Sequence, residues 1–220
     1  MFEYFYHEIL RKTVIGFGTI FNNLQIKHVD GSNKTVSVMK VPLAYGPVQK
    51  FLARIEQSPN LKGAQTLTLP RLSFEFTGLS YDPSRKVTQT QTFLSSPTSS
   101  KKDARKVYMP VPYNMSFELN MIAKVNDDAL QIVEQILPYF QPSYNLTINL
   151  LSSIGEKRDV PIVLDSVSFT DDYEGDFSER RALIYTLTFT AKTYLFGPVP
   201  SASSGIIKKA TIDYSTRKGK

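Results

Sequence analysis

The chain has 220 residues, of which 41% are hydrophobic and none is cysteine, and it carries a formal net charge of +6 at neutral pH. A chain without cysteine excludes disulfides, thiolate metal sites and cysteine nucleophiles, and it fits assembly in a reducing compartment. The length fits one domain with a substantial core, and we expect no membrane association because no segment resembles a signal peptide or a spanning helix of roughly 20 apolar residues.

Apolar residues at helical spacing predict a first helix over residues 4–21. Gly16 and Gly18 weaken its second half by about 1 kcal/mol each relative to alanine. They also form a Gly-x-Gly sequence, but it lies inside a helical pattern and lacks the third glycine of a dinucleotide-binding loop. We therefore expect no nucleotide cofactor.

A β-hairpin and a second helix are predicted next. Alternating runs at 24–29 and 34–43 flank the sequence Asp-Gly-Ser-Asn at 30–33. Asp-Gly between two such runs is a good hairpin signal. Gly46 and a proline then begin a short amphipathic helix over 47–57, since proline is well tolerated in the first helical turn.

A half-buried strand is predicted around Leu72, Phe74 and Phe76, which alternate with polar residues. The segment 82–106 differs because it is rich in serine, threonine and charged residues and shows little apolar periodicity. We predict a long mobile loop or a hairpin tip there. Loops of this length usually bind a partner or are disordered.

The clearest helix signal lies within residues 126–142. Asn126 or Asp127 is predicted to cap the helix, and the carboxylates of Asp127 and Asp128 suit the positive end of its dipole. Pro138 predicts that the regular helix ends at the residue before it. The apolar face that we expect to pack on a sheet consists of Ala129, Leu130, Val133, Ile136, Leu137 and Phe140.

Period-2 alternation predicts the remaining strands, at 117–121, 144–151, 161–170 and 183–192. The fold class is therefore α+β: a largely antiparallel, twisted sheet with two or three helices packed on it. We predict a single domain over 1–198 and an extended tail over 199–220. Within that tail, Gly205–Ser215 has the alternation of a strand and could pair with another chain's sheet edge.

The basic residues gather in two segments, and the rest of the chain is mildly acidic. Such clusters attract phosphates, but aromatic residues are not interleaved with them as a stacking platform for nucleic acid requires. We therefore favour a solvated or subunit-facing role, and specific nucleic-acid binding through 84–106 and 208–220 is the alternative function. The basic residues of the first segment are Arg85, Lys86, Lys101, Lys102, Arg105 and Lys106.

An acidic cluster surrounds Gly175 and has two interpretations. It is either a solvated hairpin turn or a surface complementary to basic residues of a neighbouring subunit, such as those of 84–106. It lacks the spacing of a calcium-binding loop, so no metal site is expected. The cluster consists of Asp171, Asp172, Glu174, Asp176 and Glu179. The candidate partner contacts are the first four of these acids, the six basic residues of 84–106, and Ile206, Ile207, Ile212 and Tyr214 of the tail.

No motif in the sequence predicts catalysis. The two histidines, His7 and His28, lack metal-ligand spacing, and a lone histidine is more often a packed or surface residue than a general base. The sequence contains neither a Walker-type phosphate-binding loop nor a Gly-x-Ser-x-Gly elbow. We expect a protein that is not an enzyme and has no cofactor.

The helix sequence also carries a family resemblance. Its most specific part runs from Asp127-Asp128 through Gln131 to Leu137-Pro138-Tyr139-Phe140-Gln141-Pro142. Weaker matches fall in the same order at Met1-Phe2, Tyr4-Phe5-Tyr6, Asn23–Lys27, Val41–Tyr45, Leu69–Leu72, Arg180-Arg181 and Leu187-Thr188-Phe189. Together these stretches resemble the proximal tail sheath stabilisation proteins, or tail terminators, of T-even-type contractile-tailed bacteriophages. The resemblance covers residues 1–196 and leaves 84–106 and the tail without a recognised motif.

The resemblance implies a non-enzymatic virion protein that forms a hexameric ring on the head-proximal end of the tail. Such a ring ends polymerisation of the tube and sheath and offers a surface to the neck. The implied partners are further copies of the chain, the tail sheath protein, the tail tube or tail completion protein, and the neck or head-connector proteins. The implied location is the virion, assembled in the host bacterial cytoplasm. The family supplies no catalytic or binding residues to carry over.

Overall fold

The computed structural model describes residues 4–29, 35–57, 68–88, 90–95, 105–172 and 182–199. The helices are α1 (Ile9–Ile20), α2 (Val48–Gln57) and α3 (Asn126–Ile136), with 3-10 turns η1 (Pro83–Arg85) and η2 (Leu137–Tyr139). The strands are β1 (Gln25–Val29), β2 (Thr35–Lys40), β3 (Leu43–Tyr45), β4 (Arg71–Tyr81), β5 (Thr92–Ser95), β6 (Arg105–Tyr108), β7 (Val111–Ala123), β8 (Ser143–Leu151), β9 (Glu156–Asp172) and β10 (Ala182–Leu195).

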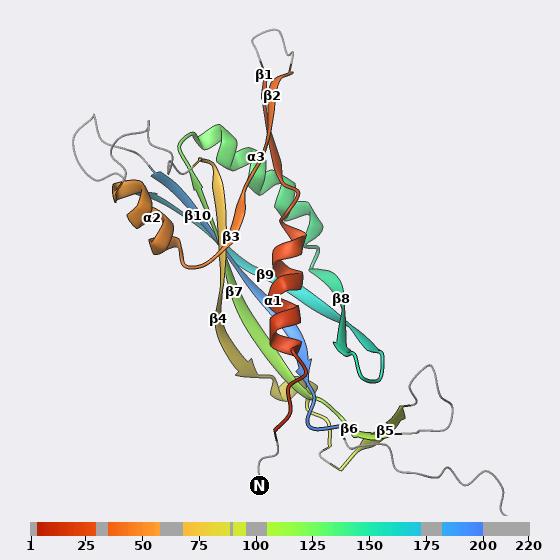
Figure 1. Ribbon diagram of the computed structural model, residues 1–220. Helices are drawn as coiled ribbons and strands as arrows, with labels where there is room; N and C mark the ends of the chain where they lie inside the picture. Colours follow the sequence, from red (N-terminus) through yellow and green to blue (C-terminus); the bar gives the residue numbers. More distant parts are fainter. Residues whose placement is uncertain are drawn as a thin grey trace, which may run out of the picture.

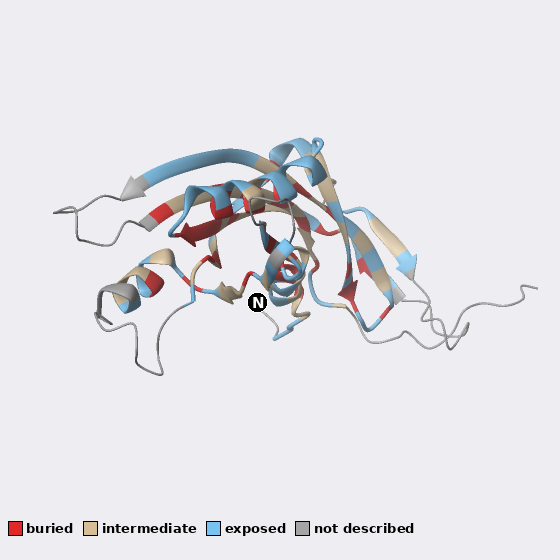
Figure 2. Ribbon diagram, turned by 90° about the horizontal axis from the view of Figure 1, so that it is seen from above, coloured by how far each residue is buried: buried red, intermediate tan, exposed pale blue. Residues whose placement is uncertain are grey.

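Six strands form one sheet in the order β3-β4-β7-β10-β9-β8. Every neighbouring pair is antiparallel except the short edge pair of β3 and β4. Figure 2 shows the sheet curling around α1, with the buried residues on the inside of the curl. The predicted α+β class, with a largely antiparallel sheet and helices packed on it, is confirmed.

Two hairpins stand apart from this sheet. β1 pairs antiparallel with β2, as the Asp-Gly signal predicted, although the connecting residues 30–34 lie outside the described part. β5 pairs antiparallel with β6. Figure 1 shows the β1–β2 hairpin projecting beyond α3 at one end of the molecule and the β5–β6 hairpin at the opposite end.

Aromatic packing holds α1 against the inside of the sheet. The ring of Phe17 is fully buried. It stacks on Phe117 of β7, with the ring centroids 4.4 Å apart and the planes 7° apart. Phe189 of β10 meets the same ring edge-on at 5.3 Å, and Phe74 of β4 lies 5.6 Å away. Each such aromatic pair contributes about 0.5–1.5 kcal/mol beyond the area it buries.

Two glycines of α1 allow this close approach. A Cβ atom on Gly18 would lie 2.6 Å from Cζ of Phe74, and one on Gly16 would lie 2.6 Å from Cδ2 of Leu146 in β8. Both distances are far below van der Waals contact. The sequence predicted only the cost of these glycines to the helix, whereas the structure shows that their missing side chains let α1 reach two strands.

Three element boundaries differ from the predicted ones. The first helix begins at Ile9 rather than at residue 4, because Glu8 has a left-handed backbone with φ of 58° that interrupts the helical path. The run 34–43 divides into β2 and β3, which belong to different sheets. β9 extends over Glu156–Asp172, well beyond the predicted 161–170.

The start of α3 also differs from its prediction. The N-cap residue is Val125, and no side chain caps the helix, so capping by Asn126 or Asp127 is wrong. The side chain of Asn126 instead accepts a hydrogen bond from the hydroxyl of Tyr185 at 3.0 Å. Asp127 and Asp128 do lie in the first turn, and the helix ends at Ile136, close to the predicted end.

The face of α3 that packs on the sheet is only partly the predicted one. Ala129, Ile132 and Ile136 are buried, whereas Leu130 and Leu137 are 48% and 39% exposed. A straight helix turns once every 3.6 residues, so residues 129 and 130 point in clearly different directions from its axis. The sheet covers the side with residue 129 and leaves residue 130 exposed. Apolar periodicity alone therefore could not separate the buried side from the exposed one.

Regular structure occupies part of the segment predicted to be a mobile loop or a hairpin tip. η1 follows Asp82 directly, and β5 and β6 form a hairpin whose connecting residues, 96–104, lie outside the described part. The hairpin alternative is therefore the one that the structure supports. The mobility of this segment stays a prediction.

The close approach of α1 predicts that Gly18→Val lowers the free energy of unfolding by about 2 kcal/mol, because the added side chain must displace the packed ring of Phe74. Urea denaturation measures this change. Gly78→Val is the matched control, since nothing lies within 4 Å of a Cβ atom at Gly78 and valine suits a strand. Equal losses in the two variants would contradict the assigned role of Gly18.

Candidate functional site

Three surface features stand out among the described residues. Among these residues, no three His, Asp or Glu side chains gather closely enough to hold a metal ion. None of the helices in the described ranges combines the length and apolar character needed to cross a bilayer. Both histidines make structural contacts: His7 Nε2 lies 2.9 Å from the carbonyl oxygen of Gly197, and His28 Nε2 lies 2.9 Å from Oδ1 of Asp128.

The first surface is the β1–β2 hairpin, which we call the arm. Two glutamines of α3 bind the edge of β1 that faces the helix. Oε1 of Gln131 accepts a hydrogen bond from the amide of Lys27 at 3.1 Å, and Nε2 of Gln135 donates to the carbonyl of Gln25 at 2.7 Å. Gln131 and Gln135 are four residues apart and so share a face of the helix, and Gln25 and Lys27 are two residues apart and so share an edge of the strand. Each glutamine can therefore reach one residue of β1. The side chains of α3 therefore replace the strand that this edge lacks.

A second contact fixes the arm to α3. Asp128 is only 7% exposed and pairs with His28 of β1, whose other ring nitrogen lies 3.3 Å from the hydroxyl of Ser37 in β2. A protonated His28 makes this contact an ion pair. The sequence predicted a packed or surface role for His28, but it could not reveal a partner 100 positions away.

The second surface, which we call the outer face of α3, consists of Leu130 in the helix and of Leu137 and Tyr139 in the η2 turn that follows it. Their exposed fractions are 48%, 39% and 69%. The exposed Glu134 lies among them on the same helix. Figure 2 shows exposed residues along the side of α3 that is turned away from the sheet. Apolar residues gathered on an exposed face are typical of a protein-binding surface.

The Arg85 side chain has a structural role that the sequence did not show. Its Nε donates to Oδ2 of Asp82 at 2.7 Å, and its Nη2 donates to Oδ1 of Asn114 at 2.9 Å and to the carbonyl of Tyr113 at 3.3 Å. Hydrogen bonds from Ser84 and Arg85 hold the pKa of Asp82 well below its usual range. These bonds use Nε and Nη2 within the chain, so they leave at most the Nη1 amino group of Arg85 for a partner such as a phosphate.

The other predicted contacts are placed only in part. Lys86 and Lys106 are exposed. Arg105 lies in β6, and Asp171 and Asp172 lie at the end of β9, paired through their backbones with the start of β10. The remaining predicted contacts lie outside the described residues: Lys101, Lys102, Glu174, Asp176, Ile206, Ile207, Ile212 and Tyr214.

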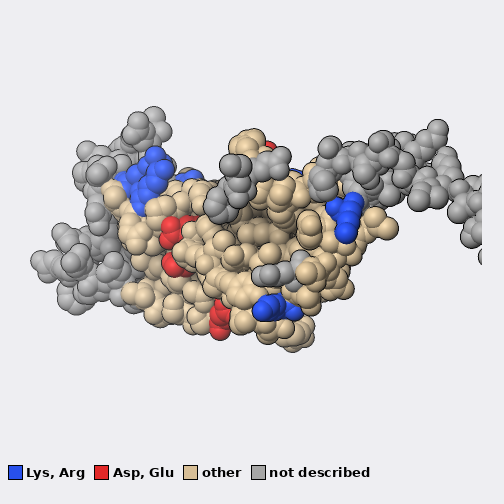
Figure 3. All heavy atoms as spheres, turned by 90° about the horizontal axis from the view of Figure 1, so that it is seen from below, with Lys and Arg blue, Asp and Glu red and all other residues tan. Residues whose placement is uncertain are grey.

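The described ends of the acidic and basic segments lie far apart. Figure 1 shows β6 at one end of the molecule and the end of β9 at the other. Figure 3 shows only scattered charged side chains on the lower face, with no continuous basic stripe among the residues described there.

A polar row crosses the outer side of the sheet. Glu75 of β4 and Glu118 of β7 are register partners. Nδ2 of Asn120 donates to Glu118 at 2.8 Å, and the hydroxyl of Thr186 donates to Oδ1 of Asn120 at 2.7 Å. Burial and the neighbouring charge of Glu118 raise the pKa of Glu75.

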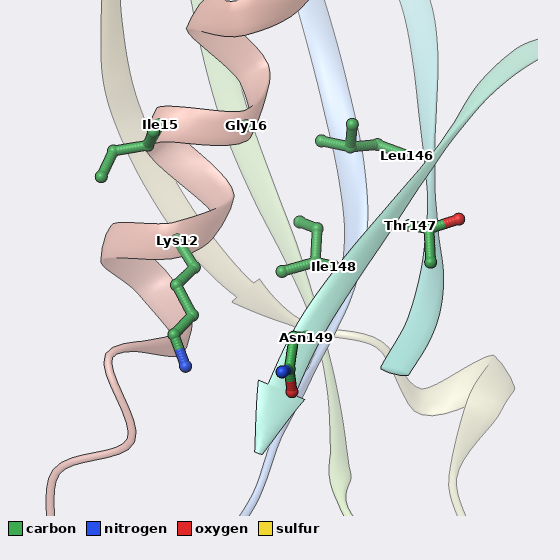
Figure 4. A pocket seen from close by; sticks show the side chains of 7 residues that line it. All are labelled: Lys12, Ile15, Gly16, Leu146, Thr147, Ile148 and Asn149. Carbon is green, nitrogen blue, oxygen red and sulfur yellow. The ribbon is translucent and has the colours of Figure 1, made fainter. Parts of the chain in front are cut away.

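The third surface is a groove of about 300 Å³ between α1 and β8. Figure 4 shows the side chains of Leu146 and Ile148 pointing from β8 toward the helix. The groove is lined by Lys12, Ile15, Gly16, Leu146, Thr147, Ile148 and Asn149. At its lower end, Nζ of Lys12 donates to the hydroxyl of Ser152 at 3.0 Å and to the carbonyl of His7 at 3.2 Å.

Comparison with known proteins agrees with the resemblance in the sequence. The profile of the family described as "T4-like virus Myoviridae tail sheath stabiliser" matches residues 4–220. The chain is also 31% identical over 223 residues to the "Tail completion protein gp15" of Enterobacteria phage T4, with 97% of this chain and 79% of that protein covered. The profile match includes 84–106 and the tail, where we recognised no motif.

The bracing of the arm predicts that Gln135→Ala speeds hydrogen exchange at the β1 amides, because the variant removes the hydrogen bonds to Gln25. We expect roughly a tenfold increase, which corresponds to about 1.4 kcal/mol of lost local stability. Glu134→Ala changes the neighbouring exposed residue and is the control. Equal exchange in the two variants would show that the arm does not depend on Gln135.

The glutamate pair predicts a pH-dependent gain in stability for Glu75→Gln. A carboxyl whose pKa is raised by folding binds its proton more tightly in the folded state, so the stability of the wild type falls as pH rises through that raised value. At neutral pH, Glu75→Gln should therefore stabilise the protein by about 0.5 kcal/mol, as expected for removal of a like-charge cross-strand pair.

Thermal denaturation at neutral pH and below the ordinary carboxyl pKa of 4.5 tests this prediction. The gain should disappear at the lower pH, where the Glu75 carboxyl is protonated. Glu134→Gln, on the exposed side of α3, should have no effect at either pH. A stabilisation that persists in acid would show that repulsion is not its cause.

Proposed function

Because the chain belongs to the T4-like virus Myoviridae tail sheath stabiliser family, a family of structural proteins of contractile tails, we propose that it forms a hexameric ring at the head-proximal end of the tail. The ring caps the tube and the sheath, ends their polymerisation and joins them to the neck proteins. The observation that carries this proposal is the similarity to the T4 tail completion protein along 97% of the chain. The role is structural, not enzymatic.

The described surfaces support ring closure. A ring needs two different surfaces on each subunit that meet head to tail. The arm and the outer face of α3 lie at one end of the molecule and the β5–β6 hairpin lies at the other (Figure 1). The two ends therefore offer unlike surfaces to neighbouring copies.

Charge complementarity supports a defined alignment of neighbouring subunits in that ring. We assign the acidic cluster that begins at Asp171 and Asp172 to contact with the basic segment 84–106 of the next subunit. The described parts of the two segments, in β6 and at the end of β9, lie at opposite ends of one molecule (Figure 1), which supports a contact between copies. Complementary charges of this kind set partner choice and register more than affinity.

The C-terminal tail supplies the remaining part of the proposal. Within Gly205–Ser215, Ala210, Ile212 and Tyr214 alternate with Thr211 and Asp213, and in the assembled phage tail this segment adds a strand to an adjacent subunit or to the sheath protein. The tube or tail completion protein and the neck or head-connector proteins are the other partners. The protein resides in the virion after assembly in the bacterial cytoplasm.

Light scattering after size-exclusion chromatography, together with electron microscopy of the protein mixed with tail tubes, tests this function. We expect a hexamer, or a monomer that assembles into rings at tube ends. A monomer that ignores tubes and binds DNA in a salt-sensitive way would overturn the proposal in favour of nucleic-acid binding.

A charge-reversed variant sharpens the same experiment. Replacing Asp172 and Glu174 with lysine should weaken ring formation, most strongly at low salt, because like charges then face each other. Asp165→Lys reverses a single exposed charge on β9, away from the strand end that carries the cluster, and is the control. Unchanged assembly of the doubly substituted protein at low salt would remove the acidic cluster from the interface.

A further inference from the structure

The edge of the main sheet at β8 has little of the usual protection, since the one irregularity in its pairing with β9 is a register shift near its end, between Asn149 and Leu151. β8 contributes nine residues to the sheet and pairs on one side with β9. Among the described strands, none pairs with its other side. Its outward side chains are Asn145, Thr147 and Asn149, all exposed and all uncharged. Natural sheets guard such edges with charges, prolines, bulges or a covering segment because an open edge invites pairing with other chains.

The groove beside this edge is shaped for one face of an extended strand. Its floor is formed by Leu146 and Ile148, which point toward α1, and its far wall is the helix at Gly16 (Figure 4). A volume of about 300 Å³ holds a few side chains but not a whole helix or strand. A strand pairing with the edge of β8 would therefore lie along the outside and insert alternate apolar side chains.

The chain leaves the described body next to this groove. The carbonyl of Gly197 lies 2.9 Å from Nε2 of His7, and the carbonyl of His7 accepts from Lys12, a residue of the groove wall. Lys12 also donates to Ser152, directly after the end of β8. Seven residues separate Gly197 from Gly205, and seven extended residues span roughly 23 Å, so the linker reaches the groove with length to spare.

The sequence of the C-terminal tail suits both faces of the sheet at β8, the face toward the groove and the outer face. In an extended strand, Ile206, Ala210, Ile212 and Tyr214 lie on one face together with Lys208, and Lys209, Thr211 and Asp213 lie on the other together with Ile207. From Ala210 to Tyr214 the first face is apolar and suits the groove. The second suits the polar outer side of β8, where Thr147 donates to the exposed Asp159 at 2.6 Å and Lys209 has an acidic partner within reach.

We propose that, before assembly, residues 205–215 of the chain bind its own β8 as an added antiparallel strand, with Ala210 and Ile212 in the groove. The antiparallel direction follows because the tail enters at the Leu151 end of β8 and runs back along it. A short tether gives an effective concentration in the millimolar range, so in dilute solution a chain's own tail outcompetes that of another copy. The added strand covers the open edge and holds the tail back until a partner displaces it.

Hydrogen exchange of the free protein tests this proposal in the absence of assembled phage tails. The outcome therefore does not depend on whether the protein forms a ring. Ile212→Pro removes a backbone donor from the tail strand and leaves the described body unchanged. We expect exchange at the β8 amides to increase at least tenfold in Ile212→Pro and in a variant that lacks 201–220. Ser203→Pro, in the linker, is the matched control and should behave as the wild type. The amides of the arm serve as an internal reference.

A second measurement tests whether the added strand comes from the same chain or from another copy. The chain has no cysteine, so Tyr214→Cys can carry a single nitroxide label. The label should broaden the resonances of β8 equally at low and high protein concentration. Broadening that appears only at high concentration would mean that another copy supplies the strand. Unchanged β8 exchange in both tail variants, or the absence of broadening, would also overturn the proposal.

Discussion

The close approach of α1 to the concave side of the sheet is the constraint on which the rest of the structure depends. Phe17 can stack on Phe117 and meet Phe189 only because Gly16 and Gly18 present no side chains to Leu146 and Phe74. The same contact fixes the distance between α1 and β8. Gly16 and Leu146 also line the groove, so the packing of α1 and the groove depend on the same residues.

α3 makes contacts on three sides, and each side has a different character. Its buried side packs on β7 and β10 through Ala129, Ile132 and Ile136. Its glutamines replace the missing neighbour of β1. Its outer side keeps leucines in water, where they cost solubility and gain nothing for the isolated chain. A helix whose three sides are all specified in this way suits a subunit that stands among other proteins.

Sequence periodicity was sufficient for features that depend on local pattern. The strands around Phe74, Phe117 and Phe189, the α+β class and the end of α3 near Pro138 are all local, and the structure confirms them. Local pattern did not reveal that Leu130 is exposed, because the width of a buried face depends on what covers it.

Features that join distant parts of the chain were not predictable in the same way. The pairing of His28 with Asp128 and the binding of β1 by two glutamines connect segments about a hundred positions apart. The bonds of Arg85 to β7 likewise depend on how the chain folds back. Each of these side chains is unremarkable in sequence, and only the tertiary structure brings its partner close.

The bracing of the arm has a mechanical consequence for a contractile assembly. A hairpin attached only at its base would bend when pulled, and its hydrogen bonds would open one after another. Here Gln131, Gln135 and Asp128 attach the arm along the length of a helix, so a sideways pull is shared among several bonds at once. That helix rests on two central strands, so a load on the described part of the arm would pass through α3 to the middle of the sheet. These contacts favour movement of the arm and the helix as one unit over bending at the base of the hairpin.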